Sequence, residues 1–124
     1  MIKPRPVNLD LGTISLPVTA KASILHRISG IFLVAAVAVL LYLLDLSLGS
    51  EASFDRATEI LGSGVARLVI WVVLAGLIYH AVAGVRHLIM DLGVGETLEG
   101  GLRSARAVFA VSAVLIIAAG FWVW

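Results

Sequence analysis

The sequence predicts an all-α membrane protein with three transmembrane helices, and two observations lead to this class. Hydrophobic residues make up 60% of the 124 residues and charged residues only 14%, whereas soluble domains are about 45–50% apolar. Three long apolar blocks also lack the polar stripe of a soluble amphipathic helix. Each block can cross a hydrocarbon core of about 30 Å once interfacial residues are added. The blocks are Ile28–Leu44, Leu68–Val85 and Ala107–Trp124.

Together with the polar segments between them, the blocks predict a single membrane-anchor domain over residues 1–124. A lead over residues 1–21 is expected to be extended as far as Pro17. After the first span, residues 49–63 predict a short interfacial helix, because apolar side chains from Phe54 to Leu61 share one face. A glycine-rich loop is expected over residues 93–101. The spans themselves are expected at about residues 22–48, 64–92 and 104–124.

The distribution of Lys and Arg predicts the orientation of the spans, because cytoplasmic loops carry the excess of these residues. Of the nine Lys and Arg residues, only Arg56 and Arg67 fall on one side of the three predicted spans. The N-terminus is therefore expected to be cytoplasmic, and the C-terminus, with Trp122 and Trp124 as interfacial anchors, is expected outside. The residues that set this orientation are Lys3, Arg5, Lys21, Arg27, Arg86, Arg103 and Arg106.

The composition excludes several kinds of site and partner. The chain has no cysteine, which rules out thiol-ligated clusters, cysteine zinc sites, haem attached through cysteine, and disulfides. A net charge of +1 gives no reason to expect a nucleic-acid partner. Pro4 and Pro6 stand where a signal peptide would be apolar. We therefore expect a multi-pass protein of a bacterial inner (plasma) membrane.

A first cluster of candidate site residues lies at the end of the second apolar block. It consists of His80, Gly84, His87 and Asp91. On a helix these positions lie within about 40° of His80, and ionisable groups on an apolar helix indicate a site or a partner. Gly76 and Gly84 flank His80 at a spacing of four and would leave a flat bed for a haem macrocycle beside the imidazole. Because His87 lies about 10.5 Å further along the axis, the two histidines cannot bind one iron from opposite faces.

Each residue of this cluster also has a simpler interpretation. His80 could be a histidine hydrogen-bonded to a neighbouring helix, and spacing alone does not choose between that role and a metal ligand. Gly76 and Gly84 could form a small-residue contact between helices. Arg86 is expected to be an ordinary interfacial anchor whose charge reaches the membrane surface. Asp91 could cap the helix or pair with a basic residue.

A second cluster stands at the start of the first predicted span. Ser23, His26, Arg27 and Gly30 follow the spacing i, i+3, i+4 and i+7 and share a helix face about 100° wide. This group could bind a carboxylate or a quinone carbonyl, because Arg donates hydrogen bonds in a planar fork. His26 and His87 also have a simpler interpretation, in which each is an interfacial histidine that binds no ligand.

Three stretches of the chain resemble the cytochrome b556 membrane-anchor subunits of bacterial succinate dehydrogenase (succinate:quinone oxidoreductase, respiratory complex II). The stretches are Arg5–Leu11, Ser23–Gly30 and His80–Asp91, and the resemblance extends over nearly the whole chain, the three-span layout included. It implies that the chain belongs to a multi-subunit helical bundle. The implied partners are a second three-span anchor subunit, an iron–sulfur subunit, a flavoprotein subunit and the lipid bilayer.

The resemblance also implies which residues form a site. A b-type haem would lie between this chain and the second anchor subunit, with His80 as this chain's axial ligand and the other ligand from the partner. Ser23 and Arg27 correspond to quinone-binding residues. His26, Arg27 and His87 correspond to positions near the haem propionates.

The implied function is to pass electrons from succinate oxidation to ubiquinone. No catalytic residue is expected in this chain, because flavin and iron–sulfur chemistry would belong to the soluble partners. A fumarate reductase anchor that uses menaquinol and a haem-free structural anchor are the alternatives. A small transporter subunit is disfavoured, because the acidic residues lie at or beyond the ends of the spans; they include Asp10, Asp45, Asp91, Glu96 and Glu99.

Overall fold

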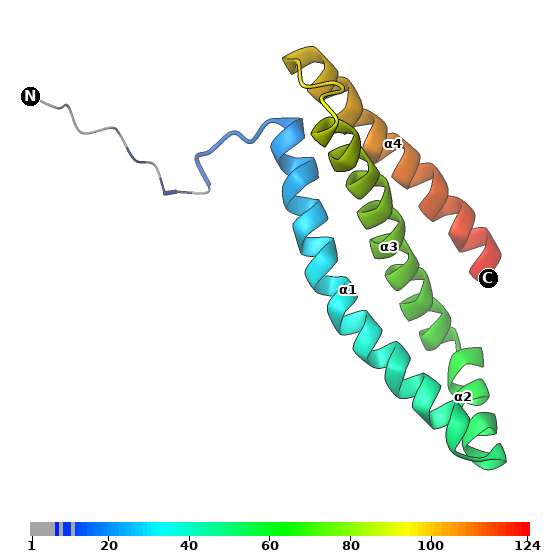
Figure 1. Ribbon diagram of the computed structural model, residues 1–124. Helices are drawn as coiled ribbons and strands as arrows, with labels where there is room; N and C mark the ends of the chain where they lie inside the picture. Colours follow the sequence, from blue (N-terminus) through cyan, green and yellow to red (C-terminus); the bar gives the residue numbers. More distant parts are fainter. Residues whose placement is uncertain (1–6, 8, 11) are drawn as a thin grey trace, which may run out of the picture.

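The computed structural model describes residues 7, 9, 10 and 12–124. Within these residues all the regular elements are helices: α1 (Val18–Gly49), α2 (Glu51–Gly62), α3 (Gly64–Asp91) and α4 (Leu98–Val123). The long helices α1, α3 and α4 lie side by side, and the short α2 joins α1 to α3 at the end far from the N-terminal lead (Figure 1). The prediction of an all-helical chain is confirmed. Lys3, Arg5 and the prolines at 4 and 6 lie outside the described residues.

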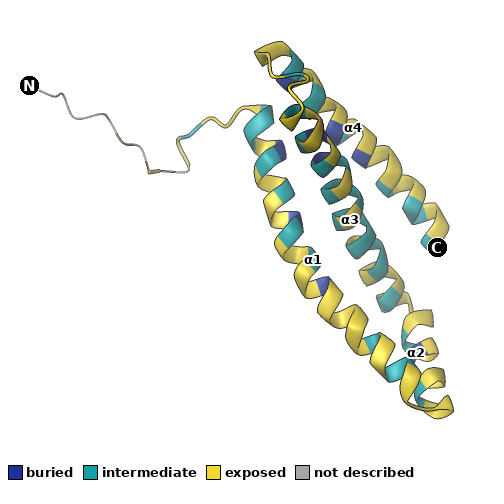
Figure 2. Cartoon of the chain, in the orientation of Figure 1, coloured by how far each residue is buried: buried dark blue, intermediate teal, exposed yellow. Residues whose placement is uncertain are grey.

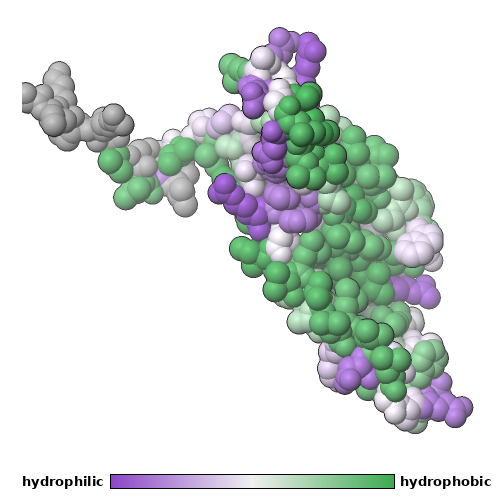
Figure 3. All heavy atoms as spheres, viewed as in Figure 1, coloured by the Kyte–Doolittle hydropathy of each residue, from purple (hydrophilic) through white to green (hydrophobic). Residues whose placement is uncertain are grey.

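Helices α1, α3 and α4 are long and apolar enough to cross a membrane. Hydrophobic side chains cover most of the middle of the face shown in Figure 3, and hydrophilic side chains gather mainly toward its two ends. Most residues of α1 and α4 are exposed, whereas most residues of α3 are half-buried or buried (Figure 2). Because soluble monomers rarely expose apolar surface on this scale, lipid or partner helices must cover it. The prediction of three long apolar spans is confirmed.

Short polar side chains begin three of the four helices. Ser50, Ser63 and Thr97 each accept a hydrogen bond from the backbone N–H three residues further on, at 3.1–3.2 Å. These bonds satisfy free N–H groups of the first turn of α2, α3 and α4. Only Ser50 separates α1 from α2, and only Ser63 separates α2 from α3. The chain therefore reverses through α2, which brings α3 back alongside α1.

Helix α4 begins earlier than the sequence suggested. The predicted loop over 93–101 is wrong for its last part, because α4 begins at Leu98 and contains the glycines at 100 and 101. Thr97 caps the first turn, and Arg103 forms an ion pair of 2.6 Å with Glu99 along the helix. These local interactions offset the low helix propensity of glycine.

Helix α3 lies between α1 and α4 and contacts both (Figure 1). Toward the rest of the bundle, α4 presents a buried stripe of small and medium residues, which are Gly101, Ala105, Val108 and Ser112. Small residues let helix backbones approach closely in a membrane. The Nε1–H of Trp71 on α3 donates to the carbonyl of Ile116 on α4 at 2.9 Å. With α4 on one side, α3 presents its histidines to α1 on the other.

Candidate functional site

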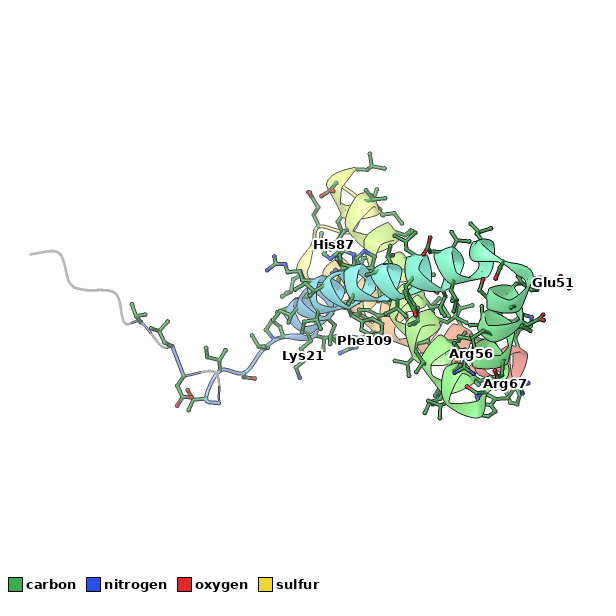
Figure 4. All side chains as sticks on the ribbon, turned by 90° about the horizontal axis from the view of Figure 1, so that it is seen from below. Lys21, Glu51, Arg56, Arg67, His87 and Phe109 are labelled. Atoms are coloured by element: carbon green, nitrogen blue, oxygen red, sulfur yellow. The ribbon has the colours of Figure 1, made fainter. Side chains whose placement is uncertain are left out.

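The three histidines lie together between α1 and α3. The ring of His26 on α1 is stacked on that of His80, with centroids 4.2 Å apart and planes inclined by 15°. His87 is tilted against the same His26 ring, at 5.0 Å. In Figure 4 His87 lies toward the end of the bundle that carries Lys21, while Glu51, Arg56 and Arg67 lie toward the other end. The histidines of the two sequence clusters therefore lie together near one end of the spans.

The hydrogen bonds of His80 fix the position of its ring proton. Its Nδ1 lies 3.2 Å from the backbone carbonyl oxygen of His26 and 3.1 Å from Oγ of Ser29. A carbonyl oxygen can only accept, so Nδ1 must carry the hydrogen. The Ser29 hydroxyl donates its own proton to the His26 carbonyl at 2.7 Å and is free to accept from Nδ1–H. In the part of the chain described, Nε2 of His80 makes no hydrogen bond, and its lone pair is available.

An open apolar groove runs beside His80 along α1. Its volume is about 270 Å³, and its lining consists of Gly30, Leu33, Val34, Val37 and His80. A Cβ atom at Gly30 would stand 3.2 Å from Cε1 of His80, so only glycine leaves the edge of the ring uncrowded. The sequence named Gly30 only as part of a helix face. The structure shows that it lies directly against the imidazole.

Gly76 and Gly84 both face side chains of α1. A Cβ atom at Gly76 would stand 2.7 Å from the ring of Phe32, and one at Gly84 would stand 3.4 Å from Nε2 of His26. These contacts match the alternative of a small-residue contact between helices. The space beside each glycine is filled by α1 in this structure, and their packing against a haem stays a prediction.

Ser23 and Arg27 lie on α1 within one turn of His26. Ser23 is half-buried and Arg27 is exposed. Neither side chain makes a hydrogen bond or an ion pair with another described residue. A free hydroxyl and a free guanidinium at the edge of the histidine cluster are able to bind a polar ligand. Asp91, at the end of α3, is exposed and also without an ion pair among the described residues.

Arg86 is not the interfacial anchor that the sequence suggested. It is only 7% exposed, and its Nε–H donates to Oγ of Ser104 on α4 at 2.9 Å. A longer hydrogen bond of 3.4 Å runs from its Nη2 to the carbonyl of Gly101. The expectation was wrong because an arginine inside a bundle can satisfy its donors on a neighbouring helix instead of reaching the surface.

The sequence patterns did not single out three polar residues of the site region. Ser29 and Ser104 are the partners of His80 and Arg86, and the hydroxyl of Tyr79 donates to the carbonyl of Ala22 at 2.9 Å. Ser29 stands inside the quoted motif of the first span, and that position is the only signal that could have found it. The contacts themselves join residues far apart in the sequence, so no local pattern records them.

Comparison with known proteins gives one consistent family. Residues 1–119 match the model of the succinate dehydrogenase/fumarate reductase transmembrane subunit family. The succinate dehydrogenase cytochrome b556 subunit of Coxiella burnetii is 42% identical over 97% of this chain and 97% of its own. The subunit of the same name from Paracoccus denitrificans is 33% identical over 91% of this chain and 87% of its own. The chain therefore belongs to the succinate dehydrogenase/fumarate reductase transmembrane subunit family.

Proposed function

We propose that this transmembrane subunit binds haem b together with a second anchor subunit and helps to form the site at which ubiquinone is reduced with electrons from succinate. The observation that carries the proposal is the arrangement of His80. Its Nδ1–H is held by the His26 carbonyl and by Ser29, so that in the neutral imidazole the lone pair lies on Nε2. Ligand histidines are typically held in this way, with the second ring nitrogen donating to a backbone or carboxylate oxygen. The names of the relatives favour succinate dehydrogenase over fumarate reductase.

The surroundings of His80 also fit a haem. The groove beside it is apolar and open along α1, which suits a macrocycle whose other face is covered by a second chain. A second axial ligand would come from the partner subunit, because His87 lies about 10.5 Å from His80 along α3 and the His26 ring is stacked on the His80 ring, so neither could bind the same iron from the opposite face. When bound, the haem would supply a one-electron carrier beside the quinone site.

His26, Arg27 and His87 would hold the haem propionates. His26 and His87 are neighbours at 5.0 Å, and the exposed guanidinium of Arg27 belongs to the next residue of α1. Positive or hydrogen-bonding groups are the partners that carboxylates require at a membrane boundary. The propionates would thus point toward the end of the bundle that carries Lys21.

Ser23 and Arg27 would bind the quinone. The hydroxyl of Ser23 would donate a hydrogen bond to a quinone carbonyl. The guanidinium of Arg27 would stabilise the negative charge that develops on the quinone oxygens as electrons arrive, in the manner of an oxyanion site. Neither side chain bonds to another described residue, so binding would not require any of the described bonds to be broken.

The iron–sulfur and flavoprotein subunits would dock at the end of the bundle that carries this site. The excess of Lys and Arg supports a cytoplasmic location for that end in a bacterial inner membrane. The N-terminal lead and the loop between α3 and α4 emerge at the same end (Figure 1). They would provide the contacts with the soluble partners.

The quinone role can be tested in the complex purified with its partner subunits. We expect Arg27→Ala to lower succinate:ubiquinone reductase activity by about 100-fold, in the range found when a single charge-stabilising donor is removed. Reduction of a soluble dye by succinate should stay at the wild-type rate, because electrons for the dye leave before the membrane site.

A matched control is Lys21→Ala, which removes another exposed cation from the same end of α1 and should leave quinone reduction near the wild-type rate. Equal quinone reduction by wild type and Arg27→Ala would contradict the assignment. Equal losses of quinone and dye reduction would also contradict it, because the defect would then lie in assembly.

A further inference from the structure

Ser29 is a buried polar residue in contact with His80, and it is not among the residues proposed above to bind the haem or the quinone directly. It is only 8% exposed, and its hydroxyl stands within 3.1 Å of Nδ1 of His80. A buried hydroxyl on an apolar helix normally satisfies itself by bonding to its own backbone, and Ser29 does so through the His26 carbonyl at 2.7 Å. That bond leaves its oxygen lone pairs facing the histidine.

The direction of each hydrogen bond follows from the three atoms together. If Ser29 donated to Nδ1, then Nδ1 would be an acceptor that faces the His26 carbonyl, another acceptor, at 3.2 Å. Two acceptors so close would repel. With the hydroxyl proton on the His26 carbonyl instead, both oxygens accept from the single Nδ1–H of His80. Ser29 is thus an acceptor that orients the imidazole.

We propose that Ser29 is a positioning residue that holds the haem-ligating imidazole of His80 and lowers the reduction potential of the haem. This inference rests on the proposed function, because it takes His80 as the iron ligand. An acceptor on Nδ1–H gives the ring partial imidazolate character and makes Nε2 a stronger donor. A stronger donor stabilises ferric iron more than ferrous iron, and hydrogen bonding of this kind is a recognised determinant of haem potential.

The chain offers a matched control for this effect. On α1, the hydroxyl of Ser47 donates to the carbonyl of Leu44 at 2.7 Å, with the same three-residue spacing and the same length as the bond from Ser29 to His26. Ser47 has no contact with a histidine among the described residues. Ser47→Ala therefore removes the same backbone interaction and leaves His80 untouched.

The test is a redox titration of the haem in the purified complex, followed through its reduced absorption band, together with the EPR spectrum of the oxidised haem. For Ser29→Ala we expect haem to be retained, since the His26 carbonyl still accepts from Nδ1–H. The potential should rise, so that the ratio of reduced to oxidised haem at a fixed ambient potential increases by about three- to tenfold, as for one ordinary hydrogen bond. The EPR g-values should shift as well.

Two further variants keep the test decisive. Ser29→Thr retains a hydroxyl that can form the same bonds on a helix and should restore a wild-type potential. If Ser29→Ala fails to assemble, Ser29→Cys keeps a similar volume, but its sulfur is a weaker acceptor than the hydroxyl oxygen. The haem potential of Ser29→Cys should therefore rise, by less than complete loss of the acceptor would produce. Ser47→Ala should match wild type.

Three results would overturn the inference while leaving the proposed function intact. They are an unchanged potential and EPR spectrum in the haem-bearing alanine or cysteine variant, an equal shift in Ser47→Ala, and a threonine variant shifted as far as alanine. A wild-type complex without b-type haem would instead overturn the proposed function, and the inference with it.

Discussion

The buried guanidinium of Arg86 joins two spans without a carboxylate partner. Its Nε and Nη2 groups bond to the hydroxyl of Ser104 and the carbonyl of Gly101 on α4. No ion pair to Arg86 occurs among the residues that the structure describes. A charged residue in a membrane span is tolerated when it faces the bundle interior and finds polar partners there. The hydrogen bonds of Arg86 therefore connect α3 to α4.

This role predicts that Arg86→Ala destabilises the bundle. The substitution removes the donors and leaves the half-buried Ser104 hydroxyl and the buried Gly101 carbonyl with fewer partners, at a cost of about 1–3 kcal/mol. We expect the purified complex in detergent to lose its fold at a lower temperature. Arg106→Ala is the control, because Arg106 on α4 is exposed and forms no ion pair with another described residue. Equal melting temperatures for Arg86→Ala and wild type would show that the hydrogen bonds of Arg86 do not stabilise the contact between α3 and α4.

At the residue scale, the sequence predicted which residues share a helix face but not how they bond. His26, His80 and Gly30 come from two segments whose spacing predicted separate helix faces, and the structure brings these faces together. The acceptors of His80 and Arg86 were missed. Each of these bonds joins residues on different helices, so it depends on the rotation of one helix against another, which periodicity does not specify.

At the scale of the elements, α1 and α3 approach each other closely where a glycine meets an aromatic ring. The ring of Phe32 lies so near Gly76 that a Cβ atom there would stand 2.7 Å from it. Such a distance is shorter than van der Waals contact, so any side chain at position 76 would push the ring or the helix away. The stacked rings of His26 and His80 lie between the same two helices.

We therefore expect Gly76→Ala to destabilise the complex by about 1–3 kcal/mol, as overpacking usually does. A second substitution, Phe32→Leu, should recover part of the loss by making room, which a double-mutant cycle of melting temperatures would reveal. Gly64→Ala is the control, since a Cβ atom at Gly64 meets nothing within 4 Å. The contact would be refuted if Gly76→Ala and Gly64→Ala had the same effect, or if the two substitutions at 76 and 32 were simply additive.

The elements themselves were largely predictable, and the main error has a physical cause. The apolar blocks, Pro17 and the apolar face from Phe54 to Leu61 predicted the helices α1, α2 and α3. The start of α4 was missed, because glycines at 100 and 101 suggested a loop. The cap at Thr97 and the Glu99–Arg103 pair stabilise the helix against the low helix propensity of these glycines. The balance between such small local effects is hard to judge from sequence.

At the scale of the whole molecule, the chain is an incomplete bundle. Three long helices leave most of their apolar side chains exposed (Figure 2), and the groove beside His80 is open. This open site supports the proposal that a haem is shared with a second subunit. The family match over residues 1–119 agrees with a chain that works only as part of a larger complex.

The most direct test of this account is the dithionite-reduced minus oxidised absorption spectrum of the purified complex, for wild type, His80→Leu and His87→Leu. We expect wild type to show a b-type haem band, His80→Leu to lose or shift it, and His87→Leu to keep it. Absence of the band in wild type would indicate a haem-free anchor. A band unchanged in His80→Leu would assign the iron to another histidine and contradict the central claim.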